Sequence, residues 1–190
     1  RGRILRVLEE QPPIPGEDMR LRISMRVQEA ANKALGDRRG AVVAIDPRDG
    51  SVLAFVSKPG FDPNLFVTGI SYADYGALRD SPDQPLFNRV LRGQYPPGST
   101  IKPVIALAGL DAGVVTRTSR FYDPGFYQLP NVSHKYRNWN RAGDGWVDMP
   151  YAIARSNDTY FYDLAHKLGI DRLHDFMIKF GIGQRVSIDM

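Results

Sequence analysis

The residues best suited to chemistry stand in the stretch YPPGSTIKP, at positions 95–103. Ser99 and Lys102 are three residues apart, so they share one face if a helix is already formed at Ser99. The apolar segment that follows predicts a buried helix, and burial disfavours the charged form of a lysine. A serine hydroxyl needs a neighbouring base before it can act as a nucleophile. The pair therefore indicates acyl transfer through Ser99, with Lys102 as the base.

A structural explanation competes with this interpretation, because serine is a favoured helix N-cap and Ser99 taken alone fits that position better. Pro103 favours a functional site, since a proline inside a helix removes the donor that would bond to the Ser99 carbonyl. Such violations of local rules are typical of functional sites. The N-terminus of the helix also directs N–H groups toward a developing oxyanion.

A second candidate is Ser156-Asn157-Asp158, between two segments of helical periodicity. An N-cap for the helix TYFYDLAHKLG explains Ser156 on position alone. A hydroxyl that reaches Ser99 from this segment could instead carry a proton to a leaving nitrogen, which is the general-acid step of amide cleavage.

Other reaction classes have little support. The histidines at 134, 166 and 174 are too far apart in the pattern to indicate a Ser/His/Asp triad. His134 could gather a metal with Asp123 and Asp144, but their spacing fits no known ligand set, so we expect no metal and no cofactor. Cysteine is absent, which removes thiol nucleophiles, and the scattered basic residues behind a net charge of +4 do not indicate nucleic-acid binding.

The elements that must position these residues belong to an ordinary folded domain. At 190 residues, with 43% hydrophobic and 24% charged residues, the chain suits one good-sized domain. Periodicity and turn residues predict helices over 25–35, 72–78 and 99–112, a hairpin of strands 41–45 and 51–56, an irregular loop over 114–148, and helices again from 149. The start at Arg1 and the end at VSIDM favour a part of a longer protein.

The motifs GSTIKP and SND, in this order, resemble the penicillin-binding proteins and serine β-lactamases. The hairpin segment AVVAIDPRDGSVLAFVSKPGFDPNLF, the segment DPGFYQLPNVSHKYRNWNRAG and the segment SNDTYFYDLAHKLGIDRL narrow the likeness. Together they resemble the elongation-specific class B transpeptidases, the penicillin-binding protein 2 family, over nearly the whole chain.

The resemblance implies an α/β (α+β) transpeptidase fold, an antiparallel sheet with helices packed around a central buried helix. Ser99 would be the acylated nucleophile, Lys102 its base, Ser156 the relay toward the leaving D-alanine, and Asp158 a substrate-binding residue in the place of the more usual asparagine. The family's K-T-G motif does not occur in the 190 residues. We therefore expect residues 1–22 to end a non-catalytic region and 23–190 to form the N-terminal half of the transpeptidase domain.

The family further implies a D,D-transpeptidase that cross-links peptidoglycan stem peptides, is acylated by β-lactams and supports cell elongation and rod shape. It implies an inner-membrane anchor outside this chain, a periplasmic catalytic domain and elongation-complex partners that include a glycosyltransferase. Two alternatives use the same residues: a D,D-carboxypeptidase or β-lactamase with water as the acceptor, and a non-catalytic sensor module that binds β-lactams.

Overall fold

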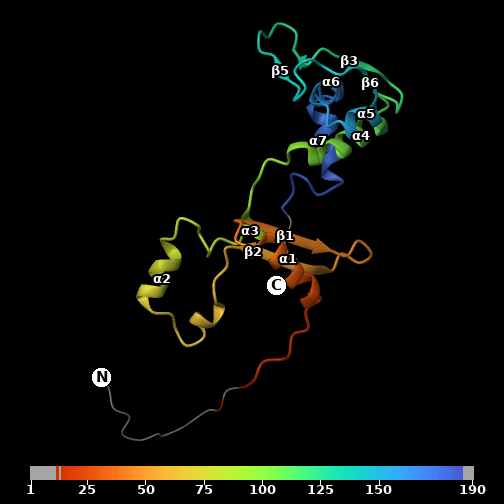
Figure 1. Cartoon of the computed structure of the whole chain (residues 1–190). Helices are drawn as coiled ribbons and strands as arrows, with labels where there is room; N and C mark the ends of the chain where they lie inside the picture. The colour runs from red at the N-terminus through yellow and green to blue at the C-terminus, as the bar shows by residue number, and fades with distance from the viewer. Residues whose placement is uncertain (1–11, 13, 186–190) are drawn as a thin grey trace, which may run out of the picture. The chain divides into compact units, whose positions relative to one another are not determined.

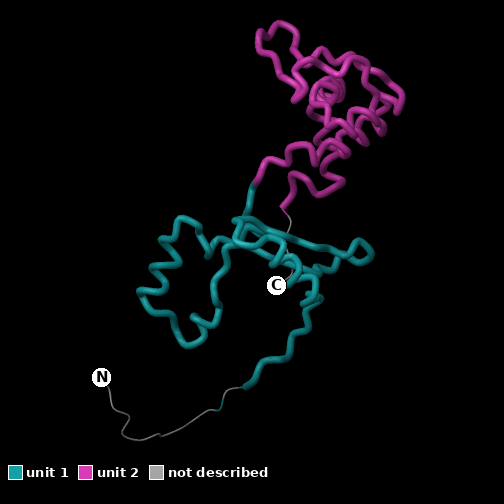
Figure 2. The backbone as a smooth tube through the Cα atoms, viewed as in Figure 1, with its two compact units in different colours: residues 1–94 teal, residues 95–190 magenta. Residues whose placement is uncertain are grey.

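A computed structural model describes residue 12 and residues 14–185 of the chain. The chain divides into two compact units, residues 1–94 and residues 95–190 (Figure 2). This division lies inside the region expected to be one half of a transpeptidase domain. The expected boundary after residue 22 stays a prediction.

In the first unit a helix packs on a β-hairpin (Figure 1). The helix is α1 (Met25–Leu35), and the antiparallel strands are β1 (Gly40–Ile45) and β2 (Val52–Lys58). The side chain of Gln28 donates to the Phe55 carbonyl at 2.9 Å and accepts from the Phe55 N–H at 2.7 Å, so α1 occupies the backbone groups that β2 does not pair with β1. The predicted helix and hairpin are confirmed.

The segment over 60–93 is irregular between short helices, and the sequence predicted its irregularity and one of the helices, around 72–78. The helices are η1 (Pro63–Phe66), α2 (Tyr72–Arg79) and α3 (Arg89–Arg92). α3 contacts both strands of the hairpin. Arg89 is buried there because its guanidinium donates to the carbonyls of Asp83, Gln84 and Phe87.

The second unit contains a hydrophobic core that α4, α5 and α6 build with Val147, and α7 packs against it (Figure 1). Its helices are η2 (Gly98–Ile101), α4 (Lys102–Asp111), α5 (Met149–Ala154), α6 (Asp158–Leu168) and α7 (Ile170–Ile178). α6 supplies Phe161, Leu164 and Leu168 to the core. The expected all-round burial of α4 is seen on one side only. Within the described residues, Leu107 and Leu110 on its other side remain exposed, because α5, α6 and α7 pack against one side.

Four short strands interrupt the region that the sequence predicted as a loop. They are β3 (Phe121–Asp123), β4 (Phe126–Tyr127), β5 (Tyr136–Arg137) and β6 (Gly145–Val147), which pair as β3 with β6 and β4 with β5. Strands of two or three residues are too short to produce an alternating pattern, so the prediction of a loop over 114–148 holds for most of the segment but missed these four strands.

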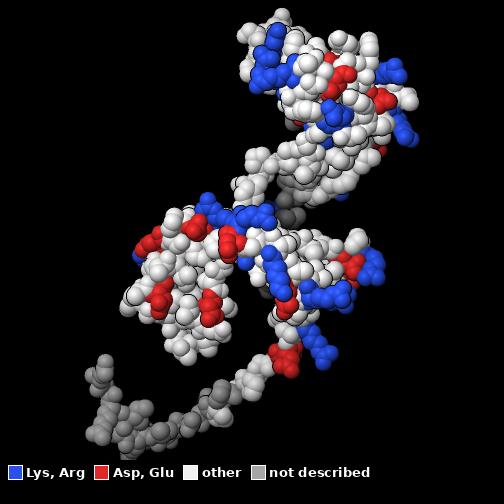
Figure 3. All heavy atoms as spheres, viewed as in Figure 1, with Lys and Arg blue, Asp and Glu red and all other residues white. Residues whose placement is uncertain are grey.

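Charge is distributed without a dominant sign on the face shown in Figure 3, where basic and acidic side chains are interspersed on both units. Among the described residues, no helix combines the length and the apolar content that a bilayer crossing requires.

Candidate active site

Ser99 lies in the 3₁₀ turn η2, which leads directly into α4, and its side chain is exposed. The N-cap explanation was wrong, because Pro97 precedes η2 and Ile101 precedes α4. Pro103 is the second residue of α4, in the first turn, where a missing N–H costs little. The expectation that Pro103 breaks a helix rule was therefore also wrong. The Ser99 carbonyl accepts instead from the N–H of Lys102.

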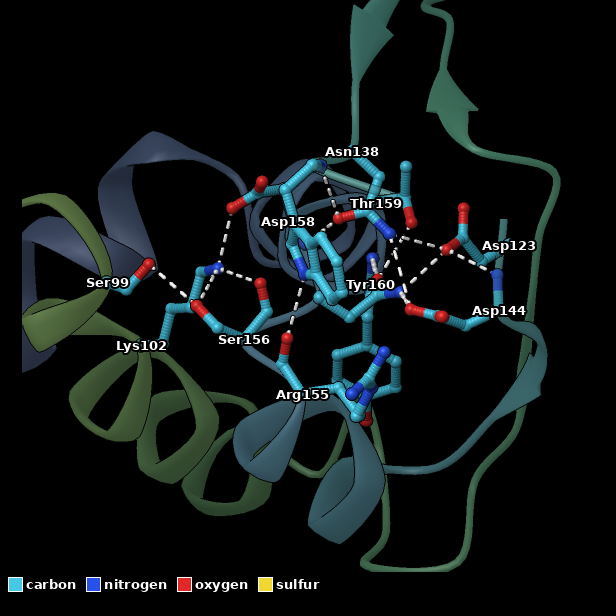
Figure 4. Close-up of polar contacts among 12 residues, drawn as sticks. Ser99, Lys102, Asp123, Asn138, Asp144, Arg155, Ser156, Asp158, Thr159 and Tyr160 are labelled. Atoms are coloured by element: carbon cyan, nitrogen blue, oxygen red, sulfur yellow. Dashed lines mark hydrogen bonds and ion pairs between the residues drawn. The ribbon is translucent and has the colours of Figure 1, made fainter. Parts of the chain in front are cut away.

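Lys102 begins α4 and is buried, with 8% of its surface exposed. Its Nζ atom lies 2.7 Å from the Ser156 carbonyl oxygen, 3.1 Å from Ser156 Oγ and 2.6 Å from Asp158 Oδ1 (Figure 4). The ring of Phe161 lies 5.6 Å from the same atom. Three oxygens match the three donors of an ammonium group, and the pairing with Asp158 offsets the cost of burying the charge.

Ser156 connects the lysine to the candidate nucleophile. Ser156 Oγ donates to Ser99 Oγ at 2.9 Å and accepts from Lys102 Nζ, so the three side chains form one hydrogen-bonded series (Figure 4). The direct contact expected between Ser99 and Lys102 is not among the hydrogen bonds of these two residues. The ammonium is drawn to the start of α6 because its carboxylate and carbonyl acceptors lie there.

The expected N-cap role of Ser156 was also wrong, because Asn157 caps α6: its side chain accepts from the N–H of Tyr160. Ser156 instead adopts a left-handed conformation with φ of 53°. Residues other than glycine rarely adopt this backbone region, because their Cβ atom makes it about 1 to 2 kcal/mol less stable. The surrounding contacts must therefore hold Ser156 in place.

Next to these residues lies a polar cluster, the Asp123 cluster, formed by the buried residues Asp123, Asn138 and Asn157 and the half-buried Asp144 (Figure 4). Of its contacts, the sequence suggested only that Asp123 and Asp144 could lie together. Burial raises the pKa of the Asp123 carboxyl, but hydrogen bonds from neighbouring side chains and from the N–H groups of Gly125 and Asp144 outweigh it, so the pKa lies below its usual value.

The sequence raised the alternative of a metal site formed by His134, Asp123 and Asp144. In the structure, Asp123 and Asp144 lie together, but His134 does not join them. His134 is exposed and its ring packs against Tyr136 at 4.7 Å between centroids. In residues 12 and 14–185 there is no group of three or more His, Asp or Glu side chains arranged to hold a metal ion. The amide nitrogens of Asn138 and Asn157 instead donate to both carboxylates and bridge them.

Comparisons with known proteins agree with the motif order. The family model of the penicillin binding protein transpeptidase domain matches residues 40–190. Peptidoglycan D,D-transpeptidase MrdA of Acinetobacter baumannii is 51% identical over 187 residues, which cover 98% of this chain and 28% of that protein. The chain thus spans less than a third of the length of this curated relative.

Two solved structures have a similar fold. The crystal structure of Pseudomonas aeruginosa PBP2 in complex with WCK 5153 has a TM-score of 0.90 and 70% identity, covering 96% of this chain and 40% of that one. The complex between PBP2 and MreC from Helicobacter pylori has a TM-score of 0.79 and 33% identity, covering 84% of this chain and 29% of that one. With the family model matched over most of its length, the chain belongs to the penicillin-binding protein transpeptidase domain family, as its two motifs predicted.

Proposed function

We propose that the protein containing this chain is a serine peptidoglycan D,D-transpeptidase, with Ser99 as its nucleophile. The observation that carries the proposal is the hydrogen-bonded series from Ser99 Oγ through Ser156 Oγ to the buried Nζ of Lys102. A weakly nucleophilic alcohol is thereby connected to an amine that can take its proton. The names of the relatives supply the reaction class.

In the proposed first step, Ser99 Oγ attacks the carbonyl carbon of the penultimate D-alanine in a stem peptide that ends in D-Ala-D-Ala. The proton of Ser99 passes to Ser156 Oγ, whose own proton passes to Lys102 in its amine form. Two of the three contacts of Lys102, to the Ser156 carbonyl and to Asp158, suit both protonation states of the amine. The contact with Ser156 Oγ must reverse its direction, and so must the hydrogen bond between the two serines, in which Ser156 donates to Ser99 in the structure.

In the proposed second step, the C–N bond breaks and the same series returns the proton to the leaving nitrogen, which departs as D-alanine. The acyl group stays on Ser99 until the amine of a neighbouring stem peptide attacks it. A β-lactam presents a similar carbonyl to Ser99 and should form a stable acyl-enzyme. The Ser99 N–H is half of the proposed oxyanion hole, and the K-T-G segment expected elsewhere in the protein supplies the other half.

Asp158 contacts Lys102 rather than leaving both carboxylate oxygens open to a substrate. Its side chain is still 28% exposed, so a role in substrate binding stays part of the proposal. The carboxylate holds the amine of Lys102 at hydrogen-bonding distance from Ser156 in either case.

The proposed setting is cell elongation at the inner membrane, with the catalytic domain in the periplasm. The Helicobacter pylori complex of PBP2 with MreC supports a protein partner of that kind for the whole protein. A glycosyltransferase of the elongation complex is a further proposed partner, because cross-linking acts on newly polymerised glycan strands.

The test uses the full-length protein, labelled with a fluorescent penicillin and mapped by mass spectrometry, and then given a stem peptide with an acceptor amine. We expect the label on Ser99, release of D-alanine and a cross-linked product. Ser99→Ala should abolish labelling, whereas the control Ser133→Ala, in an exposed loop of the same unit, should label at the parental rate.

Other outcomes separate the alternatives. Hydrolysis of the peptide without a cross-linked product would favour a carboxypeptidase, and rapid hydrolysis of the penicillin a β-lactamase. Labelling of Ser99 without any turnover of the stem peptide would favour a sensor module.

A further inference from the structure

The Asp123 cluster is an unusual feature for the centre of a small unit. Asp123 is 1% exposed, Asn138 is 2% exposed and Asn157 is fully buried. Burying such groups is costly unless their hydrogen bonds are satisfied. The proposed proton transfers use none of these side chains. Their conformations and contacts therefore require another explanation.

The Asp123 carboxylate is the acceptor at the centre of the cluster. Its Oδ2 atom accepts from the Asn138 amide at 2.8 Å, from the Asn157 amide at 2.6 Å and from the Asp144 N–H at 3.1 Å, and its Oδ1 atom accepts from the Gly125 N–H at 2.7 Å. These donors come from the turn after β3, the segment between β5 and β6, and the segment between α5 and α6. One carboxylate thus joins three segments that are distant in sequence.

The side-chain amides of Asn138 and Asn157 also bind the backbone at the second motif and at the start of α6. Asn138 Oδ1 accepts from the N–H of Asp158 at 3.1 Å. Asn157 is the middle residue of the motif, and its Oδ1 atom accepts from the N–H of Tyr160 at 2.8 Å. The nitrogen of each amide therefore donates to the Asp123 carboxylate, and its oxygen accepts from a backbone N–H at the motif or at the start of α6.

The conformation of Ser156 indicates what this constraint accomplishes. Its φ of 53° is strained for a serine, yet it directs the hydroxyl to Ser99 and the carbonyl to Lys102. A strained residue keeps such a conformation only when the surrounding structure holds it there. Asn157 and Asp158, the next two residues, are fixed by the Asp123 cluster.

We propose that Asp123 is a positioning residue for acylation, acting through Asn138 and Asn157 to hold residues 156–158 so that Ser156 and Asp158 both reach Lys102. The inference rests on the proposed function and assigns a role outside its motifs. Asp123 does not touch the substrate. Its loss should slow the acylation step and leave the initial binding of a β-lactam nearly unchanged.

The test measures the acylation rate constant and the dissociation constant of a fluorescent penicillin for the full-length protein and its variants. Asp123→Asn keeps the size of the side chain but turns an amide group toward the amide donors of the cluster. A displacement of about 1 Å at the motif should lower the acylation rate constant about 100-fold. The dissociation constant should stay near that of the parent.

Two further variants distinguish positioning from loss of stability. Leu164→Ala removes a buried side chain from the core of the same unit and should lower the melting temperature without lowering the acylation rate constant at 20 °C, a temperature chosen to lie below unfolding. Combining Asp123→Asn with Asn138→Asp exchanges the carboxylate and the amide across one hydrogen bond, so it should restore part of the rate.

If Asp123→Asn does not fold, Asn138→Ser decides, because it removes the acceptor for the Asp158 N–H and leaves the Asp123 carboxylate with its other donors. A parental acylation rate constant in the folded Asp123→Asn protein, or in Asn138→Ser when only that variant folds, would overturn the inference. The same holds if Leu164→Ala loses as much rate as Asp123→Asn at an equal loss of stability. Labelling that persists in Ser99→Ala would overturn the proposed function instead, so the two failures are distinguishable.

Discussion

Ser156 takes part in the proposed proton transfer and also has a strained backbone conformation. Its hydroxyl is the one atom in contact with both Ser99 Oγ and Lys102 Nζ among the hydrogen bonds of these side chains. Its backbone is left-handed, at a cost of about 1 to 2 kcal/mol for a residue with a Cβ atom. The conformation that links the proposed nucleophile to the proposed base is therefore less stable than an ordinary turn.

This combination predicts opposite effects on activity and stability at position 156. Ser156→Ala and Ser156→Gly both remove the hydroxyl, so each should lower the acylation rate by about 10² to 10⁴, the range expected for a lost proton relay. Ser156→Gly also relieves the strain and should stabilise the second unit by about 1 kcal/mol relative to Ser156→Ala. Fluorescent penicillin labelling and thermal unfolding of the full-length protein provide the two measurements.

An acylation rate in Ser156→Ala close to that of the parent would mean that Ser99 loses its proton by another route. Equal melting temperatures of the two variants would mean that the left-handed backbone costs little. The first result bears on the proposed mechanism, and the second only on the strain.

At the scale of elements, the turn after β3 and the segment that leads into β6 approach each other closely beside the Asp123 cluster. A Cβ atom on Gly143, which has a φ of 82°, would collide with the carbonyl oxygen of Asp123 and with the backbone at Pro124 and Gly125. Gly145 has a φ of 69°, but a Cβ atom there would meet nothing within 4 Å. The two glycines thus share a backbone preference and differ in their surroundings.

We therefore expect Gly143→Ala to displace this segment from β3 and to weaken the hydrogen bond from the Asp158 N–H to Asn138. The acylation rate constant should fall about tenfold or more. Gly145→Ala is the matched control. It should cost about 1 kcal/mol of stability for its left-handed backbone and leave the acylation rate constant unchanged. Comparing penicillin labelling and melting temperatures of both full-length variants checks this expectation, and equal rate constants in the two would contradict it.

The elements that the sequence predicted well are those whose signal is local. α1 and the β1–β2 hairpin follow from periodicity and from a turn rich in Asp, Pro and Gly, and each was found within two residues of its predicted bounds. The same methods placed Ser99, Lys102 and Ser156 as candidates. They did not find the link between Ser99 and Lys102 through Ser156, because side-chain contacts between distant segments leave no periodic trace.

The Asp123 cluster is the clearest case of that limit. In the sequence, Asn157 belongs to the second motif, Asp123 was considered only as a metal ligand, and Asn138 was not singled out, so nothing in the pattern joins the three residues. Only the pairing of β3 with β6 and the position of α6 bring them together. A buried carboxylate that accepts several hydrogen bonds could be recognised only after the chain had been folded.

At the scale of the whole molecule, these residues contain the proposed nucleophile and its proposed proton path, and the K-T-G motif does not occur in the sequence. Residues 1–190 produced alone should therefore take up penicillin far more slowly than the full-length protein. A missing oxyanion donor costs about 3 kcal/mol of barrier, which corresponds to a rate loss of about 100-fold. Gel fluorescence after labelling both proteins under the same conditions measures the difference, and circular dichroism verifies that the short protein is helical. Rapid labelling of Ser99 in the folded short protein would mean that the donors needed for acylation already lie within these 190 residues.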